Sequence, residues 1–157
     1  MNYNAKAVYD SANNFLVASN ALNEKLSETN DIGTYIAPII VNTAFSIELY
    51  LKCIYMIENG QPIQGHFLDK LYRKLSKESR EMIEAIYDML VPQSPTVMIL
   101  KQKIPDMKTD LDTVLKDMSS AFIKWRYNFE GSITGFPASG PIIDALKARI
   151  KILKPEW

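Results

Sequence analysis

The sequence predicts an all-α protein, an up-and-down bundle of about five helices in a single domain that spans residues 1–157. Apolar residues recur at the three- and four-residue intervals of amphipathic helices, and no segment shows the alternation typical of a surface strand. The 157 residues and the 47% apolar content are enough for one core of ordinary size. We expect that core within about residues 5–130, followed by a loop and a helix over residues 131–157.

The first two predicted helices are long. The first runs from about Ala5 to Glu28 and ends at the polar run over residues 29–31. The second begins around Ile36 to Pro38, because proline is tolerated in a first turn, and ends at Asn59-Gly60. Apolar side chains surround this second helix on nearly every side of a helical wheel, so we expect it to be central in the bundle.

The later elements are shorter and are separated by polar or proline-rich segments. A third helix is predicted from about His66 to Leu75, with Phe67 on its apolar face, and Ser76 is expected to cap a fourth. The fourth helix is predicted over Lys77–Leu90, followed by a connection over residues 91–108 with one short helical turn. A long helix capped by Asp106 or Thr109 then ends near Glu130, and a last helix runs from Pro141 to about Leu153.

Composition excludes several classes of function. The chain is formally neutral with a pI near 6.6, so it lacks the overall positive charge usual in nucleic-acid-binding proteins. Cys53 is the only cysteine and is expected to be a small buried hydrophobe, which excludes an internal disulfide and a Cys/His zinc site. No phosphate-binding loop, dinucleotide fingerprint or nucleophile elbow occurs, so we expect no metal and no cofactor. There is no signal pattern, and Asn42, Glu48 and Lys52 break the apolar runs, so we expect a cytoplasmic protein outside the membrane.

Charged residues within the apolar helices form the candidate site. Glu48 and Lys52 lie among apolar positions of the second helix and require partners. Arg126 flanks the apolar stripe of the long helix, so a cross-helix pair with Glu48, extended by Lys52 and Glu130, is expected. Such a network either fixes the register of the helices or forms a polar pocket that binds an anion or polarises a phosphodiester.

Two further residues complete the candidate cluster. His66 follows Gly65 at a predicted helix start, where an imidazole can cap the helix or, alternatively, take part in catalysis. Tyr127 either packs at the edge of the core or serves beside Arg126.

Three motifs occur in order along the chain: A-x-S-I-E-L-Y-L-K over Ala44–Lys52, G-H-x-L-x-x-L-Y over Gly65–Tyr72, and W-R-Y-x-F-E over Trp125–Glu130. Together they resemble the HEPN superfamily (higher eukaryotes and prokaryotes nucleotide-binding), over roughly residues 5–130. The resemblance implies a bundle of four or five helices, usually a homodimer, often encoded beside nucleotidyltransferases, toxin-antitoxin pairs or phage-defence systems.

The ribonuclease members of that superfamily carry an Arg-x4-6-His motif with an upstream Glu-x-x-x-Lys/Arg element. Glu48 and Lys52 match the upstream element and Arg126 matches the arginine, but no histidine follows Arg126. General acid–base cleavage of RNA requires such a group, so the resemblance implies a noncatalytic dimeric module that binds a nucleotide, RNA or an antitoxin-like protein partner. The alternatives are a metal-independent endoribonuclease or toxin in which His66 or Tyr127 replaces the missing histidine, and a module for protein–protein interaction alone.

Overall fold

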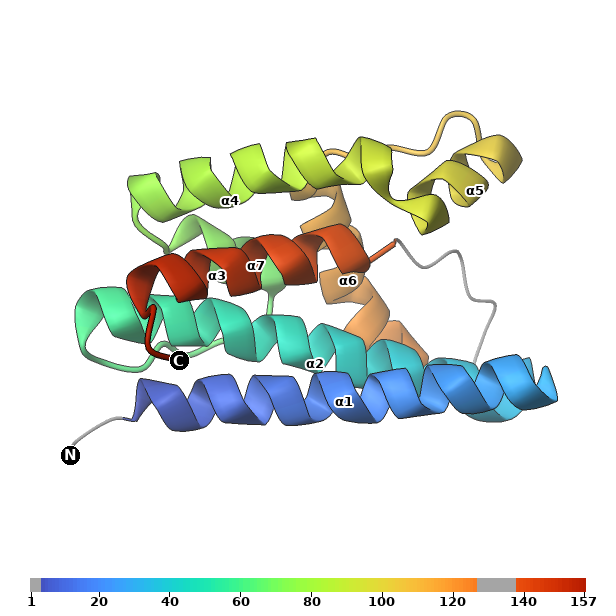
Figure 1. Cartoon of the computed structure of the whole chain (residues 1–157), viewed down its shortest axis with the longest axis horizontal. Coiled ribbons are helices and arrows are strands. Elements are labelled where there is room, and N and C mark those ends of the chain that lie inside the picture. The colour runs from blue at the N-terminus through green and yellow to red at the C-terminus, as the bar shows by residue number, and fades with distance from the viewer. Residues whose placement is uncertain (1–3, 127–137) are drawn as a thin grey trace.

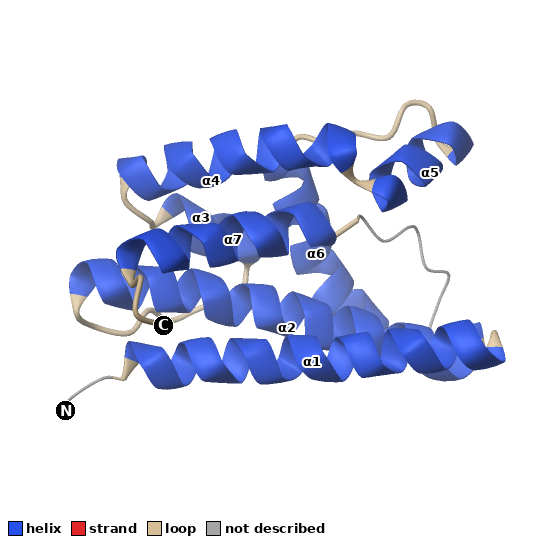
Figure 2. Ribbon diagram, in the orientation of Figure 1, coloured by secondary structure: helices blue, strands red, loops and turns tan. Residues whose placement is uncertain are grey.

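The computed structural model describes residues 4–126 and 138–157, without the side chains of residues 121–124 and 126 (Figure 1). Within these ranges every regular element is a helix and no strand occurs, which confirms the predicted all-α class (Figure 2). These ranges contain seven α-helices rather than about five. In chain order they are α1 (Ala5–Thr29), α2 (Ile32–Asn59), α3 (Leu68–Arg73), α4 (Lys77–Leu90), α5 (Pro95–Lys103), α6 (Leu111–Arg126) and α7 (Gly140–Leu153), with a 3-10 turn, η1 (Val91–Gln93), before α5.

Four of the helices lie side by side in one layer, in the spatial order α1, α2, α7 and α4 (Figure 1). Helix α6 packs against α2 behind this layer, and the short helix α3 packs against both α6 and α2. Helix α5 lies at the edge of the molecule, next to η1 and the end of α4. Helix α7, which lies between α2 and α4 in the layer, therefore comes last in the chain, after α6 behind the layer.

Helix α2 is surrounded by other helices, as its apolar circumference predicts. It packs against α1, α3, α6 and α7, and twelve of its residues are buried. By length and composition alone α2 could also cross a membrane, whereas the sequence analysis expects no span because polar residues interrupt its apolar runs. In this structure α2 lies at the centre of the core and includes Glu48 and Lys52. The cytoplasmic location stays a prediction.

Helix α7 belongs to the same core. Ile142 and Leu146 are fully buried together with Ile54 of α2 and Leu115 of α6. The core therefore includes residues beyond position 130. Apolar residues at helical spacing after Pro141 explain this burial, because they give α7 one continuous apolar face.

Helix boundaries follow the capping residues. The Asp31 side chain accepts a hydrogen bond from the Thr34 amide at 3.1 Å, so α2 begins at Ile32 and Pro38 lies inside it, seven residues in, rather than in the first turn. Ser76 caps α4 as predicted. Neither Asp106 nor Thr109 caps α6; Asp110 accepts from the Thr113 amide at 2.9 Å.

The largest difference from the sequence prediction is α5. The prediction of a connection with one short helical turn over residues 91–108 is wrong, because Pro95–Lys103 form a nine-residue helix capped by Ser94. The four consecutive apolar residues over 97–100 have no helical period, which concealed the helix. Its N-terminal signals, a serine cap followed by proline at the first position, are nevertheless regular.

Candidate functional site

A buried carboxylate is the centre of the candidate site. Glu48, in α2, is 1% exposed. One of its oxygens, Oε1, lies 2.8 Å from Nζ of Lys52, one turn further along α2, and 3.0 Å from Nδ1 of His66. We call these three residues the Glu48–Lys52–His66 cluster.

The loop between α2 and α3 has the length needed to bring His66 to Glu48. Glu48 lies twelve residues before Gly60, about 18 Å along the helix axis at 1.5 Å per residue. The six peptide steps from Gly60 to His66 span at most about 21 Å, which together with the reach of the two side chains is enough for the loop to run back along α2. Pro62 is compatible with such a path, and Gly65, at φ 111°, adopts a conformation that other residues rarely reach.

Helix α6 fixes the start of α3, two residues after His66. Ser119 of α6 accepts a hydrogen bond from the Leu68 amide at 2.7 Å and donates one to the Leu115 carbonyl at 2.8 Å. The Ser119 side chain thus satisfies an N-terminal amide of α3 that has no partner within the helix. His66 therefore lies between two fixed points, the αL end of α2 and the Ser119 contact.

Exposure increases outward through the cluster. The side chain of Glu48 is 2% exposed, that of Lys52 is 20% exposed and that of His66 is 72% exposed. A ligand can therefore approach His66 and the end of Lys52 but not the carboxylate. Since Nδ1 of His66 is engaged with Glu48, the second ring nitrogen, Nε2, is the one left for an external partner.

An aromatic and a basic side chain follow His66 in the chain. Phe67 is 44% exposed, so its predicted place on the buried face of α3, beside Leu68 and Leu71, is wrong. Nζ of Lys70 lies 4.5 Å from the centre of the Phe67 ring. The spacing of Phe67 fits the apolar stripe of α3, but Phe67 is the residue that caps the helix and therefore lies outside the stripe.

The other predicted members of the site are Arg126, the last residue of α6, and Tyr127 and Glu130, which follow it in the sequence. Tyr127, Glu130 and the side chain of Arg126 are outside the described residues, so the pair between Arg126 and Glu48 stays a prediction. The preceding residue, Trp125, packs against Ile40 of α2. Ile40 lies eight residues, or about 12 Å of helix, before Glu48.

A second buried charge, Arg149 of α7, is not among the residues predicted from the sequence. It is 3% exposed; its Nε donates to the Ser79 hydroxyl at 2.6 Å and its Nη2 donates to Glu78 at 3.1 Å. Arg149 lies within the apolar stripe formed by Ile142, Leu146 and Ile150, so its position signals a buried charge in the same way as that of Glu48.

Arg149 belongs to a network that joins three helices. Glu58, in the last turn of α2, accepts hydrogen bonds from the Ser76 amide at 2.9 Å, from the Ser76 hydroxyl at 2.7 Å and from the Ser79 hydroxyl. Ser79 thus connects Glu58 of α2 to Arg149 of α7 at the start of α4. The polar groups of this network form hydrogen bonds with one another within the protein, which is typical of a structural clamp.

Other chemically reactive groups do not extend the site. Cys53 is buried, and burial raises the pKa of its thiol to about 12, so the thiolate is scarce near neutral pH. Among residues 4–126 and 138–157, apart from the side chains not described, no three His, Cys, Asp or Glu residues are grouped to hold a metal ion.

Comparison of the chain with protein-family models, curated proteins and solved structures gives no match. The features that bear on function are therefore the geometry of the Glu48–Lys52–His66 cluster and the three motifs of the sequence.

Proposed function

We propose that this chain is a noncatalytic HEPN-type binding module that holds a phosphate-bearing ligand, a nucleotide or single-stranded RNA, at the Glu48–Lys52–His66 cluster. One observation supports this most strongly. A carboxylate with 2% of its side chain exposed holds a partly exposed lysine and a largely exposed histidine by the same oxygen, Oε1.

The cluster is organised before any ligand binds. Glu48 restrains Lys52 and His66, two side chains that can carry positive charge, so less of their freedom is lost when a ligand arrives. Glu48 compensates one positive charge, and a protonated His66 leaves the cluster with one positive charge in excess. A small local excess is consistent with a neutral protein that binds one or a few phosphates rather than duplex DNA.

Phe67 favours a nucleotide or RNA over a simple anion. An exposed aromatic ring stacks on nucleobases of any identity, and adjacent basic side chains follow the backbone. Phe67 lies next to His66, and Lys70 is one turn further along α3. Binding of this kind depends little on base sequence.

A second candidate function, metal-independent cleavage of RNA, has one observation in its favour. The contact of Glu48 with Nδ1 of His66 is the arrangement in which a carboxylate orients an imidazole, leaving Nε2 able to take up a proton. If Nδ1 carries the proton in that bond, a neutral His66 presents Nε2 as an acceptor.

Fluorescence anisotropy with a fluorescein-labelled decauridylate RNA tests the binding function. We expect Phe67→Ala and Lys52→Met each to weaken binding about tenfold, and affinity to fall between 50 and 200 mM salt. Lys103→Ala, which removes an exposed lysine on α5, is the matched control and should leave the affinity unchanged. RNA affinity that is equal in all four proteins would refute the proposed site.

Gel analysis of the same RNA separates binding from cleavage. The binding module leaves the RNA intact with and without Mg²⁺. Cleavage that is lost in His66→Gln, a variant whose amide can still contact Glu48, would establish the second candidate.

A further inference from the structure

Exposed apolar side chains gather around α5. Met89, Met98, Ile99 and Ile104 are 50 to 58% exposed, and they come from the end of α4, from α5 and from the residue after it. Val97 is the only buried residue that α5 contributes. A helix that exposes more large apolar side chains than it buries is stabilised little by packing against the core. Such an exposed apolar surface is typical of a binding site for a partner.

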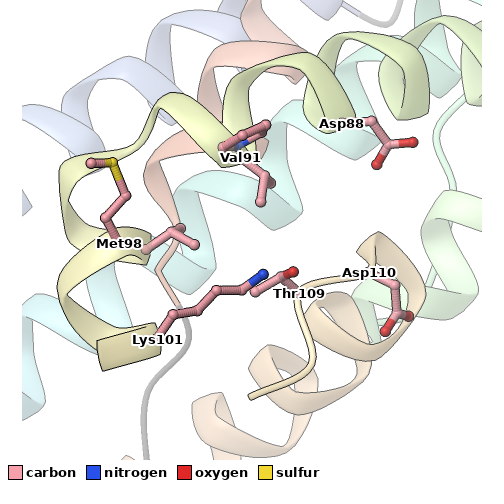
Figure 3. Close-up of a pocket in the computed structure, with 8 residues that line it drawn as sticks. Asp88, Val91, Met98, Lys101, Thr109 and Asp110 are labelled. Atoms are coloured by element: carbon pink, nitrogen blue, oxygen red, sulfur yellow. The ribbon is translucent and has the colours of Figure 1, made fainter. Parts of the chain in front are cut away.

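A pocket of about 580 Å³ lies next to these side chains, between the end of α4, η1, α5 and the segment before α6 (Figure 3). Val91, Val97 and Met98 supply apolar walls, with Val97 buried and Met98 half exposed. Asp88 and Asp110 stand on two sides of the opening, and Lys101 extends from α5 toward Thr109. Its volume suits one or two inserted side chains.

The charged groups of the pocket carry one negative charge in excess, because Asp88 and Asp110 outnumber Lys101. Hydrogen bonds from Thr113, first of all from its backbone amide, hold the pKa of Asp110 below its usual value, so this carboxylate is ionised at neutral pH. An apolar pocket with an acidic edge is complementary to an apolar side chain followed by a cation.

We propose that this pocket docks a peptide segment of a partner protein that inserts an apolar side chain against Val91, Val97 and Met98 and sets a Lys or Arg beside Asp88 and Asp110. The surface extends beyond the pocket to Ile99 and Ile104, which favours an extended or helical segment over a free small molecule. Methionine side chains adapt to varied apolar partners.

A second copy of this chain is a poorer occupant. In a two-fold contact each copy would present the same face to its partner. The excess negative charge of one copy would then face the same excess on the other, and like charges disfavour association.

A random dodecapeptide library displayed on phage, selected on the wild-type chain, supplies the probe. We expect the enriched peptides to share a large apolar residue with Lys or Arg within four positions. The best peptide, synthesised with fluorescein, should bind at least tenfold more weakly to Met98→Asp and about threefold more weakly to Asp88→Lys, measured by anisotropy.

Two variants with matched chemistry on α1 serve as controls. Val17→Asp adds a charge at another exposed apolar side chain, and Glu24→Lys reverses an exposed charge. Both should leave the peptide affinity unchanged, and circular dichroism should show all four variants folded.

Four results would overturn the proposal. Selection could enrich no peptide or peptides without basic residues, or the best peptide could bind equally well to Met98→Asp and to the wild type. Finally, light scattering that shows a wild-type dimer and a Met98→Asp monomer would assign the surface to a second copy instead.

Discussion

Removing either partner of the Glu48–Lys52 pair should lower stability by unequal amounts. Lys52→Met leaves the Glu48 carboxylate in a site where its side chain is only 2% exposed. Removing one partner of a buried pair costs about 3 to 5 kcal/mol, because the remaining charge stays out of water. His66 still contacts the same oxygen, so we expect the lower end, about 3 kcal/mol.

The opposite change should be milder. In Glu48→Gln the amide retains a polar contact, and the Lys52 ammonium, on a side chain that is 20% exposed, can move further into water on its flexible stem. We expect a loss of about 1 kcal/mol, the scale of one hydrogen bond. The double variant Lys52→Met/Glu48→Leu removes both charges and should recover most of the stability lost in Lys52→Met.

Urea unfolding followed by circular dichroism at pH 7 measures these differences. For a slope of about 2 kcal/mol per M, a loss of 3 kcal/mol lowers the midpoint by about 1.5 M. Lys77→Met is the control, because Lys77 pairs with Glu81 at 3.6 Å with both side chains more than half exposed and should contribute below about 0.5 kcal/mol. Equal losses in Lys52→Met and Glu48→Gln, or a Lys52→Met loss as small as the control, would refute the burial of this charge.

Three further predictions concern the rest of the molecule. Arg149→Ala should lower the free energy of unfolding by about 3 kcal/mol, because it leaves a cavity and removes the donor to Ser79; an unchanged urea midpoint would contradict the clamp. Asp110→Ala should cost about 1 kcal/mol at pH 7 through loss of the α6 cap. The folded-state pKa of Asp110 is lowered, so its contribution is present above the usual value of 3.8 and is lost as pH falls through the folded pKa; denaturation curves of variant and wild type should converge in acid, and a gap that widens there would be contrary. Light scattering at micromolar concentration should give twice the 17.9 kDa of one chain, and a monomer would exclude the homodimer expected from the sequence.

The sequence predicts the long helices well because their signals are local. The bounds of α4 follow from the Ser76 cap and the proline after its end, and α7 follows from Pro141. The predicted start of α2 lies four or more residues after the observed one, because Pro38 favours a first-turn position, whereas the cap at Asp31 sets the start of the helix at Ile32. Local signals of unequal strength thus compete, and only the three-dimensional contacts rank them.

The site is predictable only in part, for a physical reason. Charged residues in an apolar stripe reveal that Glu48 needs a partner, but periodicity does not say which one. His66 reaches Glu48 through the length and path of an irregular loop, which no helical period encodes. Arg149 also lies in an apolar stripe and therefore needs a partner. That partner, Ser79, lies seventy positions away in the sequence, so no local pattern identifies it.

The most direct test of the proposed site uses the only histidine of the chain. In ¹⁵N-labelled protein without a histidine tag, His66 gives the only pair of imidazole nitrogen signals, which a long-range ¹H–¹⁵N spectrum assigns to Nδ1 and Nε2. We predict that titration with AMP or decauridylate RNA shifts the Nε2 signal in a saturable way, whereas the Nδ1 signal moves less because Glu48 retains it. Imidazole signals that stay unchanged up to millimolar ligand, while backbone amides elsewhere shift, would show that the ligand binds away from the Glu48–Lys52–His66 cluster.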